Sequence, residues 1–98
     1  ANAMKQHQFR ITVEHTADAD GNPVNQAPLQ FSAPNHDNIL QIVEATAKRE
    51  GFTPETAARF AVGLKLMGEV MLENKENPLF AELKPHFMEI MKIIKNKK

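Results

Sequence analysis

The chain of 98 residues contains no cysteine, no tryptophan and no tyrosine. Without cysteine it forms no disulfide, thiolate metal site or cysteine nucleophile, and a reducing, cytoplasmic location is expected. Without tryptophan and tyrosine it has few of the residues that dominate binding hot spots. No segment approaches the ~20 apolar residues of a membrane span, so no membrane partner is expected.

The chain also has no excess of charge of either sign. Twelve basic and twelve acidic residues balance, and the isoelectric point is about 7.1. A neutral chain has no overall field that draws it to nucleic acid, so we do not expect nucleic acid as its partner.

The length predicts one domain. Residues 1–3 precede Met4 and are typical of the remnant of a cleaved expression tag, so the expected single domain covers residues 4–98.

Two segments near the N-terminus alternate between apolar and polar residues. The first has its apolar or imidazole residues at odd positions, namely His7, Phe9, Ile11, Val13 and His15. The second covers residues 27–33, and the turn-forming residues 18–23 lie between them. This pattern predicts a two-stranded antiparallel β-hairpin.

Helical spacing follows from about Asp37. The first helix is expected to run to about Glu50, with Asn35 or Asp37 as its cap and Gly51 as its stop.

A second helix is expected from Pro54 to about Glu73, because Thr53 is a good cap and proline suits the first helical position. Its main apolar face consists of Ala57, Phe60, Ala61, Leu64, Met67, Gly68 and Met71. A second apolar stripe, formed by Val62, Leu66 and Val70, lies nearly opposite. Gly63 and Gly68 indicate close approach of a neighbouring backbone.

The C-terminal segment repeats the cap-then-proline signal at Asn77 and Pro78. Pro85 lacks an amide hydrogen and would clash with the preceding turn. We therefore predict a break or kink there, with a final helix from Pro85 to about Lys95. The expected fold is α+β, with an N-terminal two-stranded antiparallel β-hairpin packed on three α-helices in the order ββααα.

No catalytic, metal or cofactor site is predicted. The segment from Asp18 to Asn22 resembles the middle of a calcium loop, but Ala27 falls where that loop needs a bidentate glutamate, which favours a hairpin turn. No two of the four histidines have the helical spacing of a metal pair.

Residues 31–71 resemble the ribbon-helix-helix DNA-binding fold, with a strand, a helix, the junction at residues 49–53 and a second helix. That resemblance implies a dimer in which Gln30 and Ser32 face bases and Thr53 meets the phosphate backbone. The strand, however, carries no arginine or lysine, Pro28 and Pro34 bracket it, and a hairpin partner already occupies one of its edges.

A second resemblance covers nearly the whole chain. The strand of residues 9–15, the turn of residues 20–23, the strand around Phe31 and the helix junction at residues 49–52 are similar to domain of unknown function 3861, a family of short bacterial proteins. This resemblance implies a compact bacterial protein with no assigned activity and no transferable site residues.

The leading functional hypothesis is a non-enzymatic protein-interaction module. It would form a homodimer or bind a protein partner through the stripe of Val62, Leu66 and Val70 or through a strand edge. The alternative is a ribbon-helix-helix DNA-binding regulator, and the third hypothesis is a small enzyme of unknown reaction.

Overall fold

The computed structural model describes residues 5–96, so the predicted tag remnant at residues 1–3 lies outside the described residues. Two strands are followed by three helices, which confirms the predicted α+β class and the order ββααα. The chain forms two compact units whose boundary in the sequence lies between Asp37 and Asn38. The first unit contains the hairpin and the second contains the helices.

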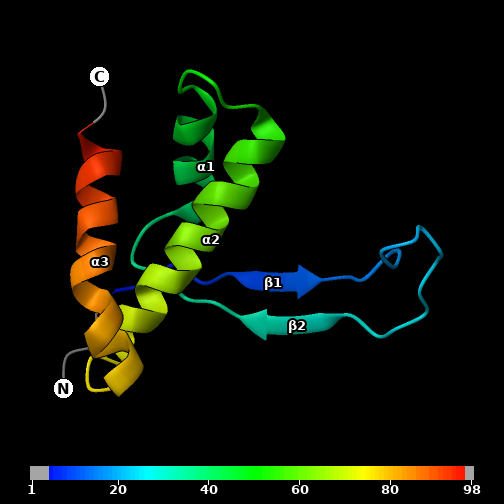
Figure 1. The fold of residues 1–98 in the computed structure, drawn as a ribbon, viewed down its shortest axis with the longest axis horizontal. Helices are drawn as coiled ribbons and strands as arrows, with labels where there is room; N and C mark the ends of the chain where they lie inside the picture. Colours follow the sequence, from blue (N-terminus) through cyan, green and yellow to red (C-terminus); the bar gives the residue numbers. More distant parts are fainter. Residues whose placement is uncertain (1–4, 97–98) are drawn as a thin grey trace. The chain divides into compact units, whose positions relative to one another are not determined.

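The hairpin consists of β1 (Arg10–Val13) and β2 (Leu29–Ser32), which pair antiparallel (Figure 1). Ile11 lies opposite Phe31, and Val13 lies opposite Leu29. Because side chains alternate across a strand, these four apolar residues share one face of the two-stranded ribbon. The other face carries Arg10, Thr12, Gln30 and Ser32.

The outer turn of the hairpin is held by Asp18. Its Oδ1 accepts hydrogen bonds from the backbone N–H groups of Asp20 and Asn22, both at 2.9 Å. Its backbone carbonyl accepts the N–H of Gly21, which has a φ of +89°. Glycine adopts this left-handed conformation without steric cost, so the residues 18–22 serve as turn chemistry, as the sequence predicted.

Helix α1 (Ile39–Ala47) is shorter than expected, and its cap is Asn38 rather than Asn35 or Asp37. The Asn38 side chain accepts from the N–H groups of Leu40 and Gln41. Asn35 cannot take this role because its side chain accepts from Asp37 N–H at 2.9 Å and its backbone pairs with His7. The helix ends before the predicted Glu50.

Helix α2 (Pro54–Glu73) has the predicted bounds, with Thr53 as cap and proline in the first turn. A Cβ placed on Gly68 would lie 3.1 Å from Cζ of Phe87, so a neighbouring helix does approach closely there, but with a side chain and not with the predicted backbone. At Gly63 the expectation is wrong, because no atom lies within 4 Å of such a Cβ.

Helix α3 (Pro78–Lys95) continues through Pro85 as a single helix, so of the predicted break or kink the break is wrong, and the helix begins at Pro78 and not at Pro85. Proline removes the hydrogen bond that its N–H would give to the carbonyl of Ala81. Ala81 and Pro85 are both exposed. Water can therefore hydrate that carbonyl, and the helix on either side persists.

In the helical unit, α2 packs against both α1 and α3. The buried apolar residues of this unit are Ile39 in α1 and Ala57, Ala61 and Met71 in α2. Arg49, just after α1, donates from Nη1 to the carbonyl of Ile94 at 3.3 Å, which places a cation at the C-terminal end of α3. Within the described residues, none of the helices combines the length and apolar character required to cross a bilayer.

Candidate interaction surface on the β-ribbon

The apolar face of the ribbon, defined by Ile11, Val13, Leu29 and Phe31, is largely exposed. Val13 is 53 % exposed, Leu29 61 % and Phe31 38 %, while Ile11 is half-buried. Cross-strand pairing gathers these residues from segments 16 or more positions apart in the chain. Contiguous exposed apolar side chains are typical of surfaces that bind other molecules.

The same face continues toward the base of the hairpin. Phe9 accepts through its carbonyl the N–H of Ala33 at 2.9 Å, and His7 exchanges two backbone hydrogen bonds with Asn35. Exposure falls in this direction, since Phe9 is half-buried and Ala33 is 9 % exposed. The outer end of the ribbon therefore carries the more accessible apolar residues.

The polar face of the ribbon contains the residues that the ribbon-helix-helix resemblance assigned to bases. Gln30 and Ser32 are exposed, and Gln30 Nε2 donates to Thr12 Oγ1 at 3.3 Å. Thr53 caps α2, with its Oγ1 accepting from Thr56 N–H at 3.1 Å. β2 pairs with β1 of the same chain, whereas the ribbon of that fold is built from strands of two chains.

The stripe predicted on α2 is divided between surface and interior. Val62 and Leu66 are half-buried, and Val70 is 45 % exposed. Two residues expected on the main buried face, Phe60 and Met67, are instead 41 % and 44 % exposed. The side of α2 that is covered is thus rotated relative to the sequence expectation.

No three His, Asp or Glu residues gather into a metal-binding group within residues 5–96. Hydrogen bonds, first that from Asn22 N–H, lower the pKa of the Asp18 carboxyl below the ordinary 3.8. These bonds favour the charged carboxylate because backbone donors stabilise it. The carboxylate is thereby engaged in the turn.

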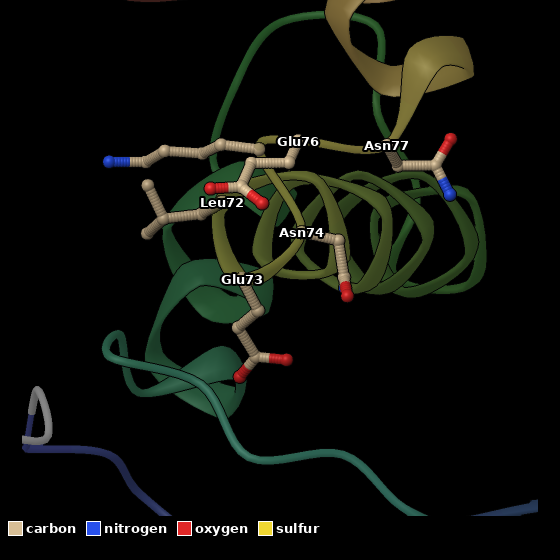
Figure 2. Close-up of a pocket in the computed structure, with 6 residues that line it drawn as sticks. Leu72, Glu73, Asn74, Glu76 and Asn77 are labelled. Atoms are coloured by element: carbon tan, nitrogen blue, oxygen red, sulfur yellow. The ribbon is translucent and has the colours of Figure 1, made fainter.

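A pocket of about 450 Å³ lies at the turn between α2 and α3, lined by residues 72–77 (Figure 2). Its two asparagines serve the helix ends. Asn74 Nδ2 donates to the carbonyl of Val70 at 2.8 Å, and Asn77 Oδ1 accepts from Leu79 N–H at 2.9 Å. Figure 2 shows Glu73 and Asn77 pointing in different directions, so this pocket is the hollow of a turn.

Sequence reasoning found the two strands but assigned their apolar face to the interior. The signal for an exposed face was present in the chain: the alternation occurs in two strands only, and a two-stranded sheet buries little by itself. The exposure of each residue could not be read from the alternation, because the pattern shows which residues share a face and not what covers it.

Comparison with known proteins agrees with the whole-chain resemblance. A crystal structure of a protein of unknown function from Pectobacterium atrosepticum SCRI1043 is 33% identical and superimposes with a TM-score of 0.80, covering 95% of this chain and 100% of that one. Among curated proteins, none matches. The model of a family described as a domain of unknown function with a solved structure, DUF3861, matches residues 7–96, and the chain belongs to this family.

Proposed function

We propose that the protein is a non-enzymatic interaction module that binds a second protein chain, either another copy or a partner, through the β-ribbon. The observation that carries this proposal is the exposure of Val13 and Leu29, at 53 % and 61 %, directly opposite each other on the apolar face. The cytoplasm is the compartment we propose for this binding, because a chain with no cysteine gains no disulfide from an oxidising one.

Energetic considerations support a binding role for this face. Complete burial of a valine, leucine or phenylalanine side chain is worth about 1.5–3 kcal/mol. A two-stranded sheet is marginally stable alone and becomes stable when more strands or a covering surface are added. A partner that covers the apolar face therefore stabilises the ribbon as it binds.

The non-enzymatic part of the proposal rests on the distribution of reactive groups. The polar residues within β1 and β2 are Arg10, Thr12, Gln30 and Ser32, and none of these has a carboxylate or imidazole that could act as general base. Glu14, directly after β1, is exposed on the same face without an imidazole in the paired strands. The carboxylate of Asp18 is occupied by backbone donors of its own turn.

The test compares the molar mass of the wild-type protein over a range of concentrations with that of a double variant, Val13→Thr with Leu29→Thr. Threonine is β-branched and suits a strand, but it removes apolar surface at both positions. We expect the wild type to self-associate or to bind its partner and the variant to lose this association. Gln30→Thr, on the opposite face, is the matched control and should behave as the wild type.

A different pair of results would contradict the proposed binding role. If the wild type stays monomeric and the double variant unfolds more easily by several kcal/mol, as large changes in a buried core do, then the chain itself covers this face. The ribbon would then be interior surface, and the proposed binding role would fail.

The stripe on α2 provides a second surface for the same function. We expect Val62→Glu and Leu66→Glu to disrupt association and to leave a folded monomer, as measured by molar mass and circular dichroism. Val70→Glu is the control for folding, because Val70 is already 45 % exposed. If both substitutions unfold the protein while Val70→Glu does not, the stripe belongs to the core.

A further inference from the structure

The two edges of the ribbon differ in the hydrogen-bonding groups that they present. His7 exchanges both backbone hydrogen bonds with Asn35, and Phe9 accepts from Ala33. Hydrogen-bonded pairs recur at every second residue of an antiparallel ladder. Odd residues of β1 therefore point their backbone groups inward to β2, and even residues point theirs outward.

Prolines at both ends of β2 reduce the number of hydrogen-bond donors on its outer edge. Pro28 and Pro34 flank Gln30 and Ser32 at even positions, and proline has no N–H to donate. Proline on an exposed edge is a known protection against pairing with another strand. An added strand would find few donors along this edge.

The outer edge of β1 has no such protection. Its outward residues are Gln8, Arg10, Thr12 and Glu14, all of them exposed and none of them proline. In the part of the chain that the structure describes, the sheet has two strands, so no third strand covers this edge. Each of these residues offers one N–H and one carbonyl to a further strand.

The charges on this edge are self-complementary. Arg10 and Glu14 lie two residues before and after Thr12. We propose that a second copy of this chain adds its β1 antiparallel to β1, with Thr12 opposite Thr12 of the second copy. Arg10 then faces Glu14 of the second copy, and the two-fold symmetry of the pair repeats this contact.

Other registers lack this match. A pairing centred on Arg10 or on Glu14 brings like charges directly opposite each other, which is unfavourable. A pairing centred between them, on Ile11 or Val13, leaves both charges opposite neutral residues. In the proposed register Ile11 also lies opposite Val13 of the second copy, so the apolar face continues across a four-stranded sheet.

This inference rests on the proposed interaction role and identifies the binding partner as a second copy of the chain. The first test reverses one charge at a time, with Arg10→Glu and Glu14→Arg. Each single variant places two like-charge pairs in its homodimer, and we expect its dimer dissociation constant to rise at least about tenfold. The double variant carrying both changes restores the pairs and should dimerise as the wild type does.

Mixing the two single variants provides the sharpest form of this test. In the mixed pair, each glutamate of one chain faces an arginine of the other. We expect the mixture to form a heterodimer under conditions where each variant alone is monomeric, which native mass spectrometry and light scattering can measure. Failure of the mixture to associate would overturn the register.

A single introduced cysteine reports the register directly, because the natural chain has none. Directly opposite residues in a hydrogen-bonded pair have Cα atoms about 5.5 Å apart, within the range that a disulfide spans. We expect Thr12→Cys to form a cross-linked dimer on mild oxidation. Gln30→Cys, on β2, is the matched control and should not cross-link, because two strands separate it from its copy.

The outcomes separate this inference from the proposed function. A dimer that ignores the charge reversals and does not cross-link through Thr12→Cys overturns the β1 pairing and leaves binding through the apolar face in place. A wild type that is monomeric at every concentration overturns pairing with a second copy, and the threonine variants of the apolar face then decide the proposed function alone.

Discussion

At the scale of single residues, Asp18 determines the shape of the outer turn through its own carboxylate. Oδ1 accepts two backbone hydrogen bonds, and the donors lower the pKa of the group. Because the folded-state pKa lies below the ordinary 3.8, the charged form stabilises the turn above that value. This stabilisation is lost as the pH falls through the folded-state pKa.

We predict that the turn opens in acid and that Asp18→Asn removes this pH dependence, since asparagine has no charge to titrate. The amide chemical shifts of Gly21 and Asn22, followed by NMR from about pH 6 to pH 2, measure the change. Asp20→Asn is the control, because no hydrogen bond of the turn uses its carboxylate. A turn that keeps its shifts in acid would contradict the prediction.

The two glycines inside α2, Gly63 and Gly68, differ in their surroundings, although both lie in the interior of the helix. Alanine at Gly63 would meet no atom within 4 Å, so we predict that Gly63→Ala stabilises the protein. The gain expected from reduced backbone entropy is about 0.5–1 kcal/mol. Gly68→Ala places its Cβ 3.1 Å from Phe87, so the ring must shift and the gain is lost.

Urea unfolding of the two variants measures this difference directly. The midpoint of Gly63→Ala should lie above that of the wild type, and the midpoint of Gly68→Ala should lie below that of Gly63→Ala. Equal midpoints would show that Phe87 moves aside without cost.

At the scale of elements, α3 tolerates an internal proline because the affected carbonyl lies at the surface. Pro85→Ala restores the missing hydrogen bond to Ala81, and we predict a gain in unfolding free energy of up to about 3 kcal/mol. Pro78→Ala is the matched control, because the first helical position needs no such bond. A loss of stability in Pro85→Ala, measured by denaturant unfolding, would be the contrary result.

At the scale of the whole molecule, the balance of charge opposes the ribbon-helix-helix alternative. The formal net charge is zero, and Glu55 adds a negative charge to the first turn of α2, where that fold meets phosphate. Neutralisation of phosphate supplies much of the affinity for DNA. The protein therefore offers little of the electrostatic attraction that such a regulator needs.

We predict no salt-dependent binding to duplex DNA at micromolar protein concentration. Fluorescence anisotropy of a labelled duplex in low and high salt measures it, with a basic DNA-binding protein as the positive control. Tight binding that weakens steeply with salt would reverse our preference and favour the regulator.

The sequence by itself determined the features that depend on near neighbours along the chain. The alternation in residues 7–15 and 27–33 placed the strands, because strand side chains change face at every residue. Thr53 and Pro54 placed the start of α2, because a cap acts within one helical turn. Where several caps competed, as at Asn35, Asp37 and Asn38, sequence reasoning chose wrongly.

Only the tertiary structure decided which surfaces are covered. Phe60 and Met67 are exposed and Val62 is half-buried because the packing of α1 and α3 against α2, and not the apolar pattern of α2, selects its buried side. The contact between Gly68 and Phe87 joins residues far apart in the chain. The exposure of Val13 and Leu29 was likewise decided by tertiary structure. Periodicity shows which residues share a face, whereas their burial depends on whether another part of the protein packs against that face.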